Sequence, residues 1–477
     1  MGMVAAALRM FGYDAVEDRK RRKPPTVALM SEDNQLNATD RRKLVSTTRD
    51  LHRNYEVAAW MIRQHLNYVS SFSFQAKTGI ADLDELIEDL VARWSRPENF
   101  DVAGRHGRRR FVRLAEGRRT LDGDVGALKL DDRGRELTGR LQAIEGDRLR
   151  TPTLGGLPAG IDPNRLIHGV QVDGTGRPLA YALCNRNPIG DGFTFARMVP
   201  AGHLQMLGYY DRFDQVRGIS PVACAINRLR DTYEAFDYAL AKAKVAQLFA
   251  LAIYSDLTDT AGEVYTSDGG ADADEDGQAD EGSEKYTVDL GRGPVKLELE
   301  PGDKAEFLES KTPSTEFRNY GEFAIAVALL SLDLPFTFFD VTKANFAASR
   351  LQIWQYEQTC KPKRDDLRDW LDALTYWRLQ LAVRDGELKL PAGWTVADLV
   401  GKWEWVHSGI PWIQKLADIK ADAVAVDRGF SSTVRVCKEQ GVDAYALVDE
   451  EAEYRKYRRA KLGIDLAVPA EPVEPKA

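Results

Sequence analysis

Apolar residues recur at helical spacing in the first hundred residues and then change to short alternating runs. Segments 41–69 and 82–94 each place leucine, isoleucine, valine and tryptophan side chains on one stripe, which predicts two amphipathic helices. Asp40 is the candidate N-cap of the first helix. Between about 105 and 215 the pattern is typical of short strands. Apolar runs flanking Asp173-Gly174-Thr175-Gly176 predict a β-hairpin within 166–183.

The second half of the chain is dominated by helical patterns. Pro221, a favoured residue for a first helical position, opens a long apolar-periodic stretch that predicts a helix to about Tyr254. Further helices are predicted over 316–332 and 347–384, the latter interrupted near Pro362. Three C-terminal helices are predicted over 414–427, 432–440 and 445–462.

The segments between and around these helices are less regular. Residues 1–40 contain the basic run Arg19–Lys23 and are expected to be partly flexible. Residues 256–285 are acidic and poor in bulky apolar side chains, which predicts a loop, and a short β-like patch follows it over 288–308. The proline-rich C-terminal tail after residue 463 is expected to be flexible.

Composition narrows the functional classes. The chain has 65 Lys and Arg against 73 Asp and Glu, a net charge of −8 that disfavours a protein coating DNA by neutralising phosphates. No apolar run is long enough for a membrane span, so no membrane partner is expected. The four cysteines are far apart, which argues against a zinc site and for a reducing compartment.

One acidic motif resembles half of a calcium loop. Asp272, Asp274 and Asp276 alternate and are followed by a glycine, as in the first half of an EF-hand. The twelfth position is Ser283, where a bidentate glutamate is required, and neither flank is typical of an EF-hand helix. We therefore interpret this stretch as a solvated loop, with a weak cation site as the alternative, and expect no metal site or cofactor.

A dense arginine cluster is the other charged motif. It follows Gly104 and contains residues that could contact nucleic acid or the acidic face of a partner, namely Arg105, Arg108, Arg109, Arg110, Arg113, Arg118 and Arg119. Phe111 is the only aromatic residue nearby, so base stacking is not supported. A solvated surface is the alternative interpretation.

No catalytic motif is present. The sequence lacks GxSxG, HExxH, a Walker loop and a GxGxxG between strand and helix. Its six histidines are scattered singly, and no carboxylate pair is placed to predict a raised pKa. We expect no enzymatic activity.

Short motifs along most of the chain resemble the portal proteins of tailed bacteriophages, the lambda family in particular. They lie between about residues 12 and 463 in the order and spacing of that family. They are Gly12–Ala15, Arg49–Asn54, Leu141–Leu149, Gly169–Asp173, Gly176–Tyr181, Val199–Ala201, Gln215–Pro221, Pro301–Asp303, Leu332–Pro335, Asn345–Arg350, Lys420–Ala423 and Gly429–Ser432.

Three departures from the family pattern are visible. Gly123-Asp124 stands where Gly-Glu is common, and Ala348-Ser349-Arg350 stands where Ser-Ser-Arg is usual. The acidic stretch 256–285 looks like an insertion.

The resemblance implies an α+β, ring-forming portal architecture of wing, long-helix stem, small α/β clip and helical crown. Its segments on this chain are an arm (1–40), a wing (41–220), stem helix 1 (221–254), a clip with the acidic loop (255–313), stem helix 2 (314–334), a tunnel loop (335–347), a long helix (348–385), a crown (386–463) and a tail (464–477). Two long helices bracketing a β patch suit a stem with a tip. Their apolar faces need neighbours, which a ring supplies.

The implied function is that of a subunit of the portal vertex, a ring, usually a dodecamer, through which double-stranded DNA is packaged and later ejected. The implied partners are other copies of the chain, DNA, the major capsid protein, the terminase and a head-completion or adaptor protein. The protein would act in the virion after being made and assembled in the cytoplasm of a bacterial host.

We predict particular residues for these roles. Lys343 and Asn345 are candidates for transient contact with DNA in the tunnel, the alternative being contact with the adjacent subunit only. The residues expected at the subunit interface or stem are Arg217, Pro221, Tyr233, Phe236 and Phe323.

Two other functions are compatible with the residues. The arginine clusters would also suit a DNA-binding adaptor or a recombination accessory protein, which predicts strong, salt-sensitive DNA binding by a monomer. A hydrolytic enzyme is the other alternative, its active site assembled from residues that the sequence does not link.

Overall fold

The computed structural model describes residues 31–462 apart from 153–160, 188, 190–191, 249–250, 256–302, 308–313, 344, 408 and 410–414. It divides into two units, one formed by Met1–Thr232 with Glu322–Ala477 and the other by Tyr233–Gly321. The acidic loop with Asp272, Asp274 and Asp276, and most of the predicted clip, lie outside the described residues.

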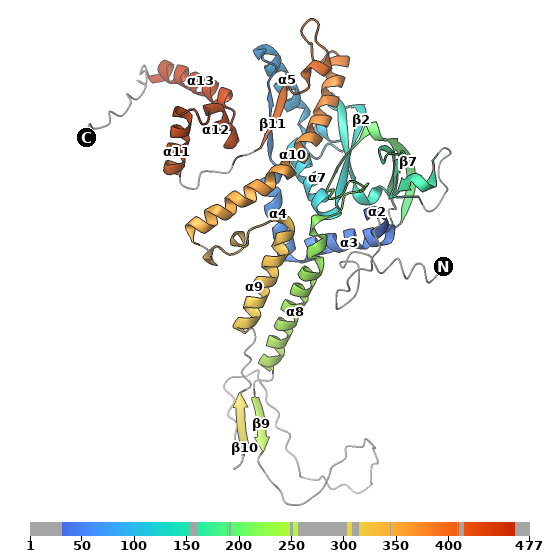
Figure 1. Ribbon diagram of the computed structural model, residues 1–477, viewed down its shortest axis with the longest axis vertical. Coiled ribbons are helices and arrows are strands. Elements are labelled where there is room, and N and C mark those ends of the chain that lie inside the picture. Colours follow the sequence, from blue (N-terminus) through green and yellow to red (C-terminus); the bar gives the residue numbers. More distant parts are fainter. Residues whose placement is uncertain are drawn as a thin grey trace, which may run out of the picture. The chain divides into compact units, whose positions relative to one another are not determined.

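The larger unit is an α+β body, as the sequence predicts (Figure 1). Its helices before the first large sheet are α2 (Glu32–Gln35), α3 (Ala38–Asn54), α4 (Glu56–Val69), α5 (Ala81–Trp94), α6 (Pro97–Phe100) and α7 (Arg108–Asp122). The predicted helix over 41–69 is therefore two helices, because Tyr55 adopts an extended conformation between them. The N-cap of α3 is Asn37, whose side chain accepts from two backbone N–H groups, and the assignment of Asp40 was wrong.

Two antiparallel sheets follow. The first has the order β3-β2-β8 and the second β4-β5-β6-β7. Their strands are β2 (Asp124–Arg133), β3 (Thr138–Glu145), β4 (Leu166–Ile167), β5 (Val170–Val172), β6 (Pro178–Arg186), β7 (Phe193–Pro200) and β8 (Leu204–Gly208). The predicted hairpin is confirmed, since β5 and β6 pair antiparallel across Asp173–Arg177. The interpretation of 105–215 as strands alone was wrong, because the arginine-rich stretch forms α7.

A long helix connects this body to the C-terminal part. Helix α10 (Phe346–Arg384) contains Pro362, yet the helix continues through it, so the predicted interruption was wrong. Its second half buries Leu367, Trp370 and Leu374 in the main apolar core. That packing stabilises the helix beyond the hydrogen bond that Pro362 cannot donate.

A small sheet joins distant parts of the chain. Strand β1 (Phe72–Ala76) pairs antiparallel with β11 (Trp403–His407), with Phe74 opposite Trp405. Segment 386–407 therefore belongs with the N-terminal body and includes the 3₁₀ helix η10 (Val396–Leu399), so the prediction of a helical crown from residue 386 was wrong for these residues. The reason is burial, since Trp405 is 1% exposed, packs on the Phe74 ring and accepts at its backbone carbonyl from Arg368 of α10.

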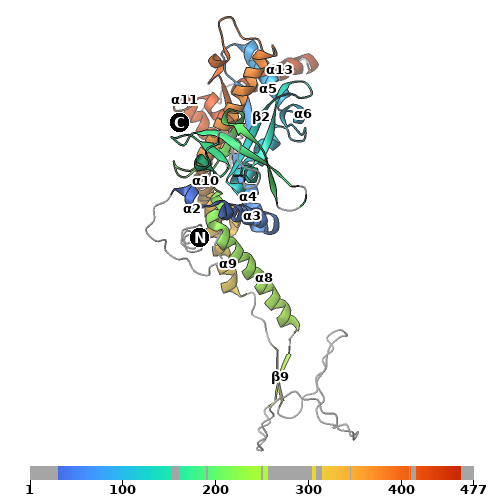
Figure 2. The same cartoon turned by 90° about the vertical axis from the view of Figure 1, so that its right-hand side faces the viewer.

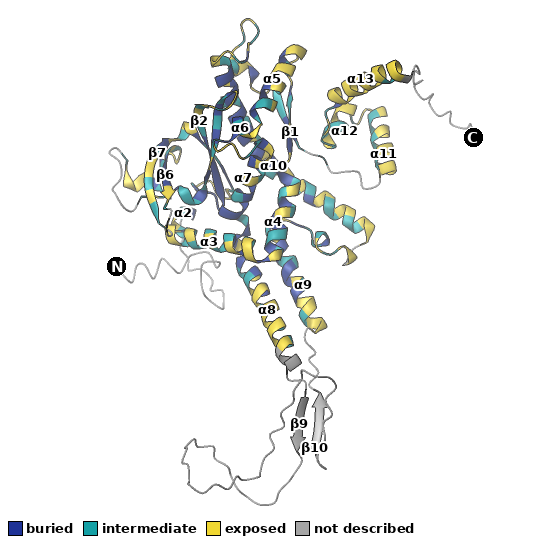
Figure 3. Cartoon of the chain, turned by 180° about the vertical axis from the view of Figure 1, so that it is seen from behind, coloured by how far each residue is buried: buried dark blue, intermediate teal, exposed yellow. Residues whose placement is uncertain are grey.

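The three predicted C-terminal helices are confirmed as α11 (Lys415–Asp427), α12 (Thr433–Glu439) and α13 (Ala444–Leu462). They are almost wholly exposed or half-buried, in contrast to the core of the body (Figure 3). Among their described residues only Ala444 is buried.

The stem segment begins in the body. Pro221 opens the 3₁₀ helix η6 (Pro221–Ala225), and α8 (Ile226–Leu248) follows it. The predicted helix to Tyr254 was too long, because Leu251–Ser255 forms strand β9, which pairs antiparallel with β10 (Asp303–Phe307). Backbone pairing with β10 replaces the helical bonds there.

In the smaller unit, α8 runs beside the first part of α9 (Thr315–Leu329), as both views show (Figure 1, Figure 2). The rings of Phe236 and Phe317 meet edge to face, with centroids 5.8 Å apart. A Cβ on Gly321 would lie 2.9 Å from the Phe236 ring, so this glycine permits the close approach of the two helices.

Candidate functional site

A buried group of charged side chains fixes the chain just before the stem helix. Arg217 donates from Nε and Nη2 to the two carboxylate oxygens of Asp124, at 2.6 and 2.7 Å. Arg41 donates to the same carboxylate at 3.1 Å. We call Arg41, Asp124 and Arg217 the Arg217 cluster. The bidentate geometry is the strong form of this pairing.

Arg217 makes all its described contacts within its own chain. It also donates to the backbone carbonyls of Gly146, Leu149 and His168, at 2.8 to 2.9 Å. Its side chain is 1% exposed. The interface role of Arg217 stays a prediction; within the chain, its side chain joins Asp124 to the segment Gly146–Leu149 and to His168.

The electrostatics of Asp124 follow from this arrangement. Burial alone would raise the pKa of Asp124, but the guanidiniums of Arg217 and Arg41 and their hydrogen bonds lower it below its ordinary value. The carboxylate is therefore ionised and paired in the folded protein.

Two glycines allow the backbones around the cluster to meet. Gly123 has φ +94°, and a Cβ there would overlap the carbonyl of Gly218. A Cβ on Gly218 would in turn overlap the Gly123 carbonyl. The Gly123-Asp124 pair and the Gln215–Pro221 motif, 90 residues apart in the sequence, thus form one structural unit.

The rest of the Gln215–Pro221 motif is also bound within the chain. Gln215 donates to the carbonyls of Tyr209 and Arg217, and Ser220 donates to that of Thr120 at 2.7 Å. The Ser220 hydroxyl also accepts from Val222 N–H, capping η6 beside Pro221. The motif therefore anchors the start of the stem segment.

Arg49, from the Arg49–Asn54 motif, also forms ion pairs within the chain. Carboxylate oxygens of Asp122, Glu145 and Asp147 lie within 4.8 Å of one another, a spacing that could suit a cation. Arg49 donates to all three carboxylates, and Arg186 donates to Glu145 and Asp147. All three carboxylates are therefore paired with guanidiniums in an ion-pair network.

Sequence reasoning missed a second buried polar network. His65 Nε2 lies 2.9 Å from Glu116 Oε1, and the Tyr209 hydroxyl donates to the same oxygen at 3.0 Å. Arg119 stacks on the Tyr209 ring at 3.9 Å and pairs with Asp366. Glu116 and Arg119 share α7, but His65, Tyr209 and Asp366 come from other parts of the chain, so no local sequence signal could have linked the whole network.

This network is not an active site. The side chains of His65 and Glu116 are both 0% exposed, so no substrate reaches them. Burial lowers the pKa of His65, and the pKa of Glu116 is lowered because Arg119 and His65 outweigh its burial. A neutral imidazole beside a paired carboxylate is a structural arrangement.

The first residues of the predicted tunnel loop pack on α4 through aromatic rings. Phe338 stacks on Tyr68 at 5.4 Å, and Phe339 meets Trp60 edge to face at 5.7 Å. These rings belong to the 3₁₀ helix η8 (Phe336–Phe338) and its end, and they pack on α4. The residues that follow project from this aromatic base, with Val341 69% exposed.

The two predicted DNA-contact residues lie after that base. Lys343 ends the 3₁₀ helix η9 (Val341–Lys343), and its side chain lies outside the described part of the structure. Asn345 is exposed, and its side-chain oxygen accepts from Ala348 N–H at 2.8 Å. Asn345 is thus the N-cap of α10, a role the sequence analysis did not assign.

The stem helices carry exposed aromatic and aliphatic side chains. On α8 these include the predicted Tyr233 and Phe236, which are 46% and 36% exposed, and Tyr238 at 71%. Phe323 on α9 is 65% exposed. Large apolar side chains left in water on this scale mark contact surfaces.

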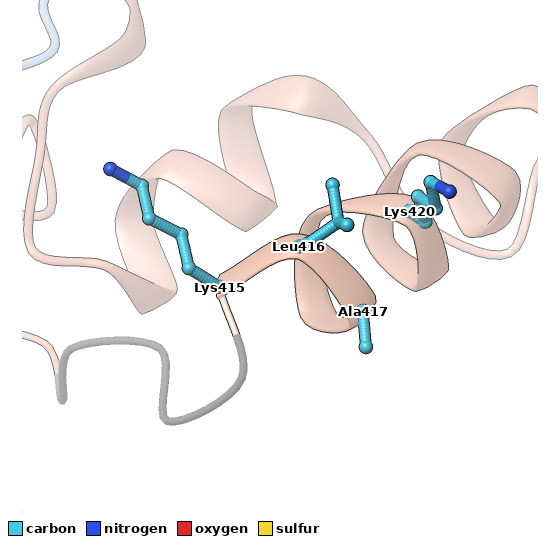
Figure 4. Close-up of a pocket in the computed structure, with 4 residues that line it drawn as sticks. All are labelled: Lys415, Leu416, Ala417 and Lys420. Carbon is cyan, nitrogen blue, oxygen red and sulfur yellow. The ribbon is translucent and has the colours of Figure 1, made fainter.

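A surface hollow at the start of α11 does not have the side chains of a catalytic or ligand-binding site. Lys415, Leu416, Ala417 and Lys420 line it, all from one helix, and the two lysine side chains point away from each other (Figure 4). It brings no acidic or nucleophilic group together with the lysines. In the described part of the chain, no helix is long and apolar enough to cross a membrane.

Comparisons with known proteins agree with the motif pattern. Residues 20–364 match the family described as "Phage portal protein, lambda family". A probable portal protein of Halomonas phage phiHAP-1 is 25% identical over 402 residues, which cover 80% of this chain and 72% of that protein.

Solved structures give looser likenesses. The virion of a native gene transfer agent particle contains a chain 16% identical, with coverage of 84% of this chain and 94% of that one and a TM-score of 0.41. A chain in the neck of an empty gene transfer agent particle is 15% identical, with coverage of 83% and 93% and a TM-score of 0.46. Since the family match spans well over half of its residues, this chain belongs to the lambda family of phage portal proteins.

Proposed function

We propose that this portal subunit assembles into a ring, of the twelve copies that the family resemblance implies, through which double-stranded DNA enters and leaves the capsid. The observation that carries the proposal is the set of exposed apolar side chains on α8 and α9, including Tyr238 and Phe323. Neighbouring copies would bury them. The role is structural and not catalytic.

The predicted segments become proposals in corrected form. The stem is α8 and α9, and the clip includes β9 and β10. The tunnel loop is 335–345, ending at the N-cap of α10. We propose 415–462 as the crown and 386–407 as part of the wing, which the pairing of β11 with β1 supports.

The same role implies contacts beyond the ring. We propose that the ring sits at a capsid vertex in the virion, after assembly in the host cytoplasm. The major capsid protein, the terminase and then a head-completion or adaptor protein would dock on it.

The experiment is the native mass of the purified protein, together with class averages of negatively stained particles. A ring with a central hole is expected. A protein that stays monomeric at every concentration, and binds DNA in a strongly salt-dependent way, would favour the DNA-binding adaptor instead.

A paired substitution tests the surface that carries the proposal. Tyr238→Asp places a charge in the apolar contact and should shift the mass from ring to monomer without lowering the thermal midpoint of the monomer. Asp237→Asn, at the neighbouring exposed position, is the matched control and should leave the ring intact. Rings of equal abundance in both variants would exclude this surface.

We further propose that Lys343 touches the DNA backbone as it passes. Its position after a fixed aromatic base, in an exposed stretch, supports this role. Lys343→Ala rings should package or retain less DNA, whereas Lys343→Arg rings and the control Lys361→Ala should behave normally. Normal packaging by Lys343→Ala rings would leave Lys343 with a contact to the adjacent subunit only.

A further inference from the structure

The arginine-rich stretch that the sequence analysis singled out is not used by the proposed conduit. The structure separates its members. Arg119 is buried and pairs with Glu116 and Asp366, and Arg113 donates to Asn67 at 2.9 Å. Arg109 and Arg110 are exposed, and among the described residues neither has an ion-pair or hydrogen-bond partner for its side chain.

These two arginines lie at the N-terminus of α7, where positive charge is unfavourable. Gly107 is the N-cap and supplies no side-chain acceptor, and the first turn contains no acidic residue. The helix dipole places partial positive charge at this end, so Arg108, Arg109 and Arg110 add charge of the same sign. Such an arrangement favours an external anion.

Arg108 adds an independent observation. It is 8% exposed, stacks on the Trp405 ring at 4.6 Å, and donates only to Ser95 Oγ and the Phe72 carbonyl. No carboxylate pairs with it among the described residues, and its Nη2 has no partner there. Burial, followed by the charge of Arg109, lowers the pKa of Arg108 to about 10, which is the signature of an uncompensated cation.

A groove opens beside these arginines. It has a volume of about 620 Å³, and its walls combine apolar, polar and charged side chains. They come from β1, α5 and the start of α7, and are Ser73, Phe74, Glu88, Val91, Ala92, Ser95, Gly107, Arg108, Arg109 and Arg110.

One wall of the groove is an open strand edge. In the described residues β1 pairs only with β11. Ala76 N–H donates to Glu88, and the Phe72 carbonyl accepts from Arg108, so the even-numbered residues of β1 direct their backbone groups away from β11. By the same alternation the N–H and C=O of Phe74 face the groove, where no described backbone pairs with them.

We propose that this groove binds an extended, acidic segment of a partner protein, which pairs with the backbone of Phe74 and places carboxylates on Arg109, Arg110 and Arg108. Strand addition supplies the main-chain bonds, and the arginines select acidic side chains. DNA fits less well, because apolar side chains line part of the groove and a nucleic-acid backbone has no N–H and C=O groups to pair with those of Phe74.

The test uses the full-length protein and a fluorescein-labelled hexapeptide of alternating valine and glutamate, followed by fluorescence anisotropy. Binding that weakens with salt is expected, and Arg109→Glu with Arg110→Glu should weaken it by about tenfold or more. Acidic residues at a helix N-terminus favour the helix, so this double variant should fold at least as well as the wild type.

The matched control reverses two other exposed arginines, with Arg133→Glu and Arg135→Glu, and should bind the peptide as the wild type does. A peptide N-methylated at its central valine should bind several-fold more weakly, because it cannot complete the strand pair. Equal losses in both double variants would reduce the effect to diffuse charge and overturn the proposal. So would a labelled DNA duplex that displaces the peptide and depends on the same two arginines.

Discussion

At the scale of single residues, Arg217 donates to Asp124 and to three backbone carbonyls, and a substitution tests what these bonds contribute to stability. Arg217→Met would leave the Asp124 carboxylate buried with Arg41 as its only described charged partner, beside the Gly218 N–H. Removing one member of a buried ion pair costs about 3–5 kcal/mol. Urea unfolding should therefore show a loss of about that size.

The exposed pair between Arg384 and Asp131 provides the comparison. Arg384→Met should cost far less unfolding free energy than Arg217→Met, because water screens a pair in which both side chains are about half exposed. If the two substitutions cost the same, the Arg217 cluster is not the anchor that its geometry indicates.

The environment of His168 predicts that folding stability depends on pH. Burial, followed by the nearby Arg41, lowers the pKa of His168 from 6.5 to about 4, and its Nε2 lies 3.1 Å from the carbonyl oxygen of Asp33. Arg217 and Asp124 also face it. Below pH 6.5 the unfolded chain therefore binds a proton that the folded chain does not, so stability falls as the pH drops from 7 to 5, by about 2 kcal/mol from this group.

His168→Asn removes the imidazole and suits the positive φ of 47° at this position. The variant should lose about that part of the pH dependence of its unfolding free energy between pH 7 and pH 5. An unchanged pH profile would show that the imidazole is protonated in the folded protein as readily as in the unfolded chain.

At the scale of elements, substitutions of Asn345 at the start of α10 can distinguish its role as a helix cap from its predicted role in DNA contact. Asn345→Ala should cost about 1 kcal/mol, because the bond to Ala348 N–H is lost. Asn345→Asp keeps a side-chain oxygen at the cap and should be nearly neutral in thermal unfolding, while it adds negative charge facing any DNA. A loss in Asn345→Asp as large as in Asn345→Ala would contradict the capping role.

The helices and strands also show where apolar periodicity predicts secondary structure correctly and where it does not. The predicted helix 82–94 and the three C-terminal helices hold within one or two residues, because their spacing and end residues agree. The stretch predicted as one helix from Pro221 ends at Leu248 instead, and Leu251–Ser255 pairs with a strand about 50 residues later. An apolar run of that length suits a helix or a strand equally well.

At the scale of the whole molecule, the β1–β11 pair ties residues 72–76 to residues 403–407. A chain ending at Gly409 loses helices that bury only Ala444, so its unfolding free energy should change by less than about 1 kcal/mol. A chain ending at Val400 also loses buried Trp405 and Val406 and should lose about 3–6 kcal/mol. Equal stability of the two chains would contradict this assignment of β11 to the body.

The sequence by itself determined the α+β class, most helices, the hairpin at Asp173–Arg177 and, through the order of short motifs, the portal family. These follow from local periodicity and from turn and cap residues, which act over a few positions. It also indicated the exposed aromatic positions Tyr233, Phe236 and Phe323.

Only the tertiary structure decided which distant residues meet. It brought Gly123-Asp124 to Gly218, His65 to Glu116, and Phe74 with Arg108 to Trp405. It also showed that Arg217 is buried and paired with Asp124 within the chain. Such contacts depend on how burial and charge pairing are satisfied across separate elements, and no spacing within one segment encodes them.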